Sequence, residues 1–184
     1  MNVIFLDFDG VLTTIHGFLD EDVERRIKIL ADICHKYDCK VVIEAASKDA
    51  IDEDTLEIYS DWVEFVFDCF KKYKIECIGR TPNVTRKLGK FTYIDMWKED
   101  EIIQYLKEHP EVEHYCVIDD DDLLPVNNSD LNKVREHLVS PILYSDNPEE
   151  EGLLESHSSL IGEILQKEND IQLLLRRNKW KIYL

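Results

Sequence analysis

The chain has 184 residues, a hydrophobic content of 44% and a formal net charge of −17. This length and composition predict a single domain with a sizeable core, and no apolar run approaches the ~20 residues of a membrane span. The acidic balance argues against a broad nucleic-acid-binding surface, because such a surface needs Lys and Arg to neutralise phosphates, but it leaves room for a local basic patch.

The first residues and the cysteines both indicate a cytoplasmic protein. The apolar segment Asn2–Leu6 has no basic region before it and runs straight into acidic residues, unlike a signal peptide. The five cysteines are an odd number and lack the CxxC spacing of a metal site, so we expect reduced thiols. We therefore expect a cytoplasmic location and no membrane partner.

Short apolar segments alternate with amphipathic segments along the chain. Val3–Leu6 predicts a buried strand, and apolar residues at helical spacing after the acidic Asp20 predict a helix that runs to about Tyr37. Further strands are predicted at Lys40–Ile43, Ile75–Ile78, His114–Ile118 and Leu138–Tyr144, and further helices at 56–74 and 98–108. The segment 153–166 and a tail finish the chain.

This alternation predicts an α/β fold. Strands separated by helices imply a parallel sheet with right-handed crossovers, and continuous apolar strands agree with a sheet covered on both faces. We expect a three-layer, Rossmann-like domain over residues 1–167, with a C-terminal appendage over 168–184 that packs on the core or at a subunit interface. Ala50–Asp54 and the basic Val84–Tyr93 are predicted as loops.

Two carboxylates follow the first strand directly. Asp7 and Asp9 are spaced i, i+2, and because the chain turns beyond the strand's carboxyl end, both can converge on one pocket. Open α/β sheets bind ligands at this place, and Gly10 permits a backbone geometry that other residues resist. The alternative is that the two aspartates only cap the helix that follows.

A second acidic cluster, Asp119–Asp122, follows the fourth predicted strand. If the two strands are neighbours, four or more carboxylates meet in one pocket, where like charges raise each other's pKa. A hard divalent cation with oxygen ligands removes this repulsion, and Mg²⁺ suits a site that also holds a phosphate. The alternative for the second cluster is a solvated acidic turn.

The segment Phe5–Leu12 resembles the first motif of the haloacid dehalogenase-like (HAD) superfamily. This resemblance implies that Asp7 is a nucleophile toward phosphorus and that Asp9 is an acid/base. It also implies a lysine near a helix start, close to the nucleophile, for which Lys98 is the candidate and Lys48 the competitor. The alternative for Lys98 is an ordinary exposed helix lysine.

The resemblance is weakest at the second motif, a small hydroxyl residue at the end of the second strand. Glu44 occupies this place by register, and Ser47 follows three residues later. Either Ser47, together with Gly10, contacts the substrate phosphate, or phosphate binding is altered or lost. The alternative of equal weight is that Glu44 is a structural residue.

A closer resemblance covers roughly residues 2–166. The chain is similar to the HAD domain of Swiss-army-knife RNA-repair-like proteins, which typically read Ser-Ser-Ser-Trp-Arg at Glu44–Lys48. The segments between Leu12 and Lys40 and between Lys48 and Lys98 are too short for a large cap domain, so we expect an absent or minimal cap. The segments that carry the resemblance are Phe5–Leu12, Lys40–Ile43, Ile78–Pro82, Lys98–Ile102 and Val117–Asp121, with a looser match at 146–153.

The resemblance implies a Mg²⁺-dependent phosphomonoesterase that works through an aspartyl-phosphate on Asp7. The implied Mg²⁺ ligands are Asp7, Asp120, the carbonyl of Asp9 and either Asp119 itself or a ligand that Asp119 orients, while Lys98 balances charge. We expect a phosphorylated substrate, either a small molecule or a nucleic-acid end, and a monomer or homodimer. The alternatives are a phosphoprotein phosphatase or a catalytically impaired HAD domain that serves as a binding module.

Overall fold

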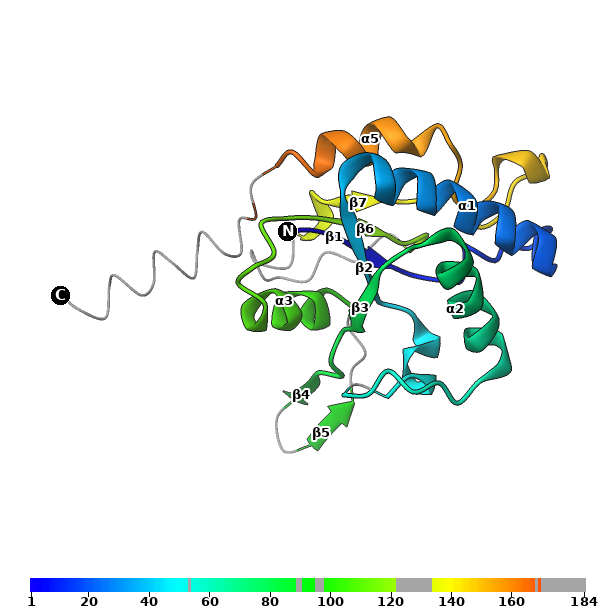
Figure 1. Cartoon of the computed structure of the whole chain (residues 1–184). Helices are drawn as coiled ribbons and strands as arrows, with labels where there is room; N and C mark the ends of the chain where they lie inside the picture. Colours follow the sequence, from blue (N-terminus) through cyan, green and yellow to red (C-terminus); the bar gives the residue numbers. More distant parts are fainter. Residues whose placement is uncertain (53, 89–90, 95–97, 122–133, 168, 170–184) are drawn as a thin grey trace.

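The structure is a computed structural model (Figure 1). For the two strands within 85–94 it describes the backbone alone. In the described part of the chain, no helix is both long and apolar enough to cross a bilayer. All five cysteines are free thiols. The described residues are 1–52, 54–88, 91–94, 98–121, 134–167 and 169.

A five-stranded sheet forms the centre of the domain, and all of its strand pairs are parallel. The strands are short. The three central strands are almost wholly buried, which agrees with the continuous apolar segments in the sequence, whereas the two edge strands are partly exposed. In spatial order they are β3 (Cys77–Arg80), β2 (Cys39–Ile43), β1 (Asn2–Leu6), β6 (His114–Ile118) and β7 (Leu138–Val139).

Helices cover both faces of this sheet (Figure 1). One core cluster joins alternate strand residues such as Ile4 and Leu6 to α1 (Asp20–Tyr37), α2 (Asp61–Tyr73) and α5 (His157–Ile164). The other cluster joins the intervening residues to α3 (Lys98–Glu108) on the opposite face. The predicted three-layer, Rossmann-like α/β fold is therefore confirmed.

The segment between β3 and α3 differs from the prediction of a loop. It contains an antiparallel hairpin of β4 (Thr85–Leu88) and β5 (Phe91–Ile94), in which Leu88 pairs with Phe91 (Figure 1). The Lys and Arg content of this segment suggested an exposed loop, whereas its Thr, Phe, Tyr and Ile residues are strand formers. The hairpin projects from the body of the domain and adds no further helical layer.

Several element boundaries also differ from the prediction. The segment before α2 is a turn in which the Asp52 carboxylate accepts hydrogen bonds from the amides of Asp54 (3.0 Å) and Thr55 (2.8 Å), so the helix begins at Asp61 instead of Leu56. The predicted loop at 50–54 begins with the last residue of the 3-10 helix η1 (Ala46–Ala50).

Two further strands end at other residues than predicted: β3 extends through Gly79 to Arg80, and β7 stops two residues before Pro141. The segment 153–166, for which no element was predicted, contains α5 from His157 to Ile164. Of the predicted C-terminal appendage only Asn169 lies within the described residues, and its side-chain amide donates to the carbonyl of Val112 (2.9 Å).

Candidate active site

Polar residues form one row at the carboxyl edge of the sheet. The strands end in register, and backbone hydrogen bonds continue the pairing one residue further: the Asp7 amide donates to Ile118 (3.0 Å), and the Glu44 amide donates to Leu6 (2.8 Å). Because strand residues alternate between faces, the row lies on the same side as α3. From one edge to the other, the row is Thr81, Glu44, Asp7, Asp119 and Ser140.

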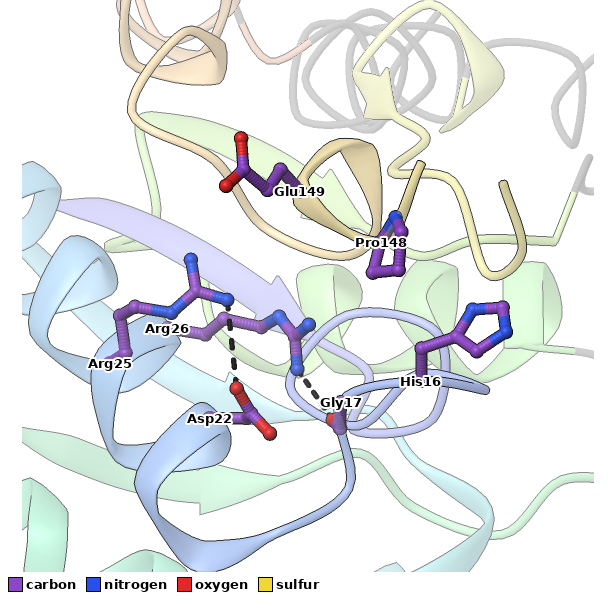
Figure 2. A pocket seen from close by; sticks show the side chains of 7 residues that line it. All are labelled: His16, Gly17, Asp22, Arg25, Arg26, Pro148 and Glu149. Atoms are coloured by element: carbon purple, nitrogen blue, oxygen red, sulfur yellow. Dashed lines mark hydrogen bonds and ion pairs between the residues drawn. The ribbon is translucent and has the colours of Figure 1, made fainter. Parts of the chain in front are cut away.

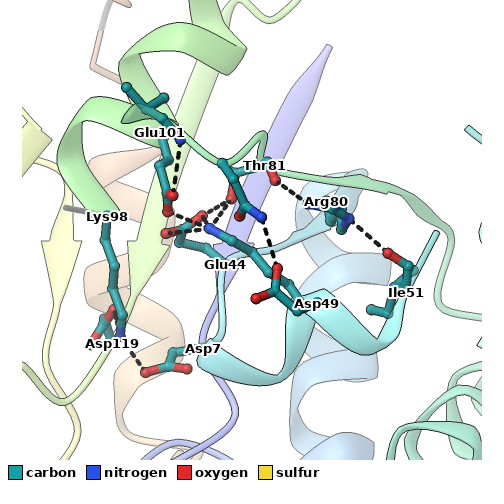
Figure 3. Close-up of polar contacts among 12 residues, drawn as sticks. Asp7, Glu44, Asp49, Ile51, Arg80, Thr81, Lys98, Glu101 and Asp119 are labelled. Carbon is teal, nitrogen blue, oxygen red and sulfur yellow. Dashed lines mark hydrogen bonds and ion pairs between the residues drawn. The ribbon is translucent and has the colours of Figure 1, made fainter. Parts of the chain in front are cut away.

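The half of the row around Asp7 is a carboxylate cluster bound to one lysine. Lys98, the first residue of α3, places its Nζ 2.6 Å from Asp7 Oδ2 and 2.7 Å from Asp119 Oδ2 (Figure 3). Asp120 joins them, and carboxylate oxygens of the three aspartates lie within 4.8 Å of one another. Asp7 and Asp119 are buried and Asp120 is half-buried.

This donor set fits a hard divalent cation. Mg²⁺ prefers oxygen ligands and is commonly held by one or two carboxylates and a substrate phosphate. Burial and the neighbouring Asp119 raise the pKa of Asp7 to about 6, although Lys98 opposes the shift. Burial also raises the pKa of Asp119. For Lys98, burial acts to lower the pKa but the charges of Asp7 and Asp119 outweigh it, so the pKa is raised.

The turn after β1 brings Asp120 against the backbone of Gly10. Gly10 has a φ of +72°, and a Cβ at this position would lie 2.1 Å from Asp120 Cγ. A glycine is therefore required both by the left-handed backbone and by the close approach of Asp120. The structure thus places Gly10 beside a candidate metal ligand.

Asp9 lies on the exposed side of the same turn. The Thr13 hydroxyl donates to Asp9 Oδ1 at 3.0 Å, so the Asp9 carboxylate is held outside the cluster of Asp7, Asp119 and Asp120. Its place as a metal ligand therefore depends on the backbone carbonyl, as the resemblance implied. An exposed carboxylate beside a buried one is suited to exchange a proton with a substrate or with water.

The other half of the row is a buried cluster that surrounds Glu44. Lys48 Nζ lies 3.3 Å from Glu44 Oε2, donates to Thr81 Oγ1 at 3.0 Å and forms an ion pair with Glu101. The Thr81 hydroxyl also contacts Glu44 Oε2. Burial raises the pKa of Glu44 well above its usual value, and Lys48 only partly opposes this. Glu44 therefore faces this cluster and is closed off from solvent.

The two candidate lysines are now distinguished by their contacts. Lys98 contacts the carboxylate predicted to be the nucleophile, whereas Lys48 is committed to Glu44, Thr81 and Glu101. Ser47 lies in η1, and its buried hydroxyl has no hydrogen-bond partner among the described residues. Among the described residues, no hydrogen bond joins Ser47 to the carboxylate cluster.

Two residues of the site, Thr81 in the row and Glu101 beside it, were not identified from the sequence. Thr81 follows β3 at the place that Asp7 occupies after β1, so correct placement of β3 would have found it. Glu101 lies three residues after Lys98, on the same side of α3, so the two side chains reach the two halves of the row.

A separate surface pocket of about 530 Å³ lies beside the loop that follows β1 (Figure 2). The buried Arg26 forms part of its wall and braces this loop: one Nη donates to the carbonyls of Leu12 (2.9 Å) and Gly17 (2.6 Å). None of the row's residues lines the pocket. Its lining residues are His16, Gly17, Asp22, Arg25, Arg26, Pro148 and Glu149.

One comparison with known proteins identifies a family. Residues 3–143 match the family described as the HAD domain in Swiss Army Knife RNA repair proteins, and this segment includes the whole row of polar residues. No curated protein matches the chain. The family match spans well over half of the 184 residues. This protein is therefore a hydrolase-type domain of the HAD superfamily and belongs to the HAD domains of Swiss Army Knife RNA repair proteins.

Proposed function

We propose that this protein is a Mg²⁺-dependent phosphomonoesterase with Asp7 as its nucleophile. The observation that carries the proposal is the contact of Lys98 with both Asp7 and Asp119 beside a third carboxylate, Asp120. Such a cluster has an excess of negative charge that a divalent cation would neutralise. Asp7, Asp119 and Asp120 would hold Mg²⁺, which supplies positive charge to bind the phosphate.

The reaction proceeds in two steps on Asp7. One carboxylate oxygen of Asp7 attacks phosphorus, the bond from phosphorus to the ester oxygen breaks, and Asp9 gives its proton to the leaving alkoxide. Asp9 then removes a proton from water, which attacks the same phosphorus and releases phosphate from Asp7. Lys98 balances the negative charge on the phosphoryl oxygens in both steps.

We propose phosphorylated nucleic-acid ends or nucleotides as the substrate class. The family description names RNA repair, and the described residues contain only a small hairpin between β3 and α3 where a substrate could be enclosed. The net charge of −17 opposes a long nucleic-acid contact, so a terminal nucleotide fits better than an extended strand. A monomer or homodimer would suffice for this reaction.

The test is phosphate release with Mg²⁺ from a panel of substrates. The panel contains p-nitrophenyl phosphate, mononucleotides, 5′- and 3′-phosphorylated RNA and DNA, and a phosphopeptide, and the Asp7→Asn variant is measured beside the natural protein. We expect release from nucleotides or nucleic-acid ends that is lost in Asp7→Asn. Turnover that survives this substitution contradicts the mechanism, and a preference for the phosphopeptide contradicts the substrate class.

One observation favours a second function, a HAD domain that binds a phosphorylated ligand without cleaving it. Glu44 occupies the place where the family has a small hydroxyl residue, so a phosphate-binding group is replaced by a carboxyl group. This candidate predicts calorimetric binding of Mg²⁺ and of a mononucleotide without phosphate release. The same panel, combined with the calorimetry, separates the two functions.

A further inference from the structure

The cluster of Glu44, Lys48, Thr81 and Glu101 has an unbalanced charge if every group is ionised. It contains two carboxylates and one ammonium group, and the side chains of Glu44, Lys48 and Glu101 are 1%, 4% and 1% exposed. Water therefore cannot screen a remaining negative charge. Burial of an uncompensated charge is costly, so a cluster of this kind retains one proton on a carboxyl group.

The contacts distinguish the two carboxyl groups. Glu101 forms the closer ion pair with Lys48, and its other oxygen accepts a hydrogen bond from the Val84 amide at 3.3 Å. Lys48 and the Val84 amide are obligate donors, which favour a carboxylate on Glu101. Glu44 lies farther from Lys48, at 3.3 and 3.4 Å. Its other contacts are the Glu101 carboxyl group and the Thr81 hydroxyl, which accepts as readily as it donates.

The other charged groups near Glu44 are already paired. Its neighbour in the row on the β1 side is Asp7, which is bound by Lys98, and its neighbour on the β3 side is the uncharged Thr81. Lys48 from η1 and Glu101 from α3 are the charged side chains in contact with Glu44 among the described residues. Burial raises the pKa of Glu44, which agrees with this arrangement of charges.

We propose that Glu101 is a positioning residue which, by taking Lys48 as its ion-pair partner, leaves Glu44 protonated and neutral in the row beside Asp7. An ionised carboxylate at this position would repel a phosphate bound to Asp7 and its neighbours. A neutral carboxyl group removes that repulsion, so the glutamate becomes compatible with the phosphate site. The consequence for phosphate rests on the proposed function, whereas the proton on Glu44 does not.

The protonation state is measured by NMR with ¹³C-labelled glutamate side chains at about pH 7, where the Glu44 signal is the one lost in Glu44→Gln. We expect the chemical shift of a protonated carboxyl group for Glu44 in the natural protein. In Glu101→Gln, Lys48 is free to pair with Glu44, so the Glu44 signal moves to the ionised position. An ionised Glu44 in the natural protein overturns the inference, even if Glu101→Gln does not fold.

The effect on the site is measured by calorimetric binding of inorganic phosphate with Mg²⁺ present. We expect Glu101→Gln to weaken phosphate binding about tenfold in the natural background, because a new like charge faces the anion. In the Glu44→Gln background, the same substitution changes binding less than about twofold, since no carboxylate can form. An equal loss in both backgrounds means that Glu101 is merely structural and overturns its assigned role.

The two proposals fail in distinguishable ways. If the natural protein neither binds phosphate nor releases it from the panel, the proposed function fails while the carboxyl NMR signal still decides the state of Glu44. If phosphate release is found and Glu44 is ionised, the proposed function stands and the inference about Glu101 fails.

Discussion

At the scale of single residues, the site depends on side chains that the chain delivers from distant positions to one row. Asp7, Asp119 and Asp120 were identifiable in the sequence, because acids directly after apolar strands meet at one edge of a parallel sheet. Lys98 was identified only through the resemblance to the HAD superfamily. Glu101 was not identifiable, since its contact with Lys48 depends on how α3 docks against the sheet. Burial and contacts of this kind leave no mark in local sequence patterns.

Replacement of Gly10 by alanine tests the close approach of Asp120. The left-handed backbone alone costs a Cβ-bearing residue about 1–2 kcal/mol, and the new methyl group would displace Asp120. We expect a lower unfolding free energy in urea and weaker Mg²⁺ binding by calorimetry. Gly79→Ala is the matched control, because its Cβ would lie 3.8 Å from the nearest atom and its backbone is unstrained. Equal behaviour of the two variants would contradict the assigned role of Gly10.

Replacement of Lys98 by methionine tests the charge balance at Asp7. The variant leaves the buried carboxylates of Asp7 and Asp119 without their cation. Removal of one charge-stabilising group from a catalytic site typically lowers the rate by about 100-fold or more. We expect this loss in kcat/KM toward the best substrate of the panel. Lys40→Met removes only the surface pair with Glu76 and should leave the rate unchanged. A Lys98→Met enzyme of natural activity would exclude Lys98 from the mechanism.

At the scale of elements, periodic segments were predicted well and irregular ones were not. α1, α3 and β6 match the predicted bounds. Apolar spacing and acidic first turns agree in the two helices, and Pro110 follows the end of α3. The β4–β5 hairpin was missed because its basic residues resembled a solvated loop. Boundaries near Asp52 and Pro141 were set by a side-chain turn and by a missing amide donor, which act over only a few residues.

The loop after β1 is held by α1, and a pair of adjacent arginines tests this. Arg26 is buried and donates to the carbonyls of Leu12 and Gly17, so Arg26→Met leaves these acceptors unsatisfied and should cost about 2 kcal/mol or more. Arg25→Met removes only an exposed pair with Asp22 at 3.9 Å, which is worth well under about 1 kcal/mol. Urea denaturation of both variants measures the difference, and similar losses would contradict the bracing role of Arg26.

At the scale of the whole molecule, the chain concentrates negative charge and leaves part of it unneutralised. The sum of −17 includes the carboxylates that converge at the carboxyl edge of the sheet, where Lys98 and Lys48 offset only part of the charge. The overall charge was readable from composition, whereas the concentration of charge at one edge follows from strand order. A cation that binds this edge therefore stabilises the entire domain by mass action.

This imbalance predicts how stability depends on pH and Mg²⁺. In the metal-free protein the pKa of Asp7 is raised from 3.8 to about 6, so the folded state binds its proton more tightly than the unfolded state does. The unfolding free energy should therefore fall as pH rises from about 4 through 6, by about 3 kcal/mol from Asp7. Glu44, Asp119 and Asp120 shift in the same direction and add to the slope.

Mg²⁺ should oppose this loss, because it binds the ionised form of the cluster. We expect thermal denaturation to show little stabilisation by Mg²⁺ at pH below about 5 and about 3 kcal/mol above pH 6 when the ion is at 100 times its Kd. Asp7→Asn should lower both the pH slope and the response to Mg²⁺, while Glu44→Gln should lower only the slope. If Mg²⁺ stabilised the natural protein equally at both pH values, its binding would not depend on deprotonation of Asp7, and the assignment of this carboxylate as a ligand would be wrong.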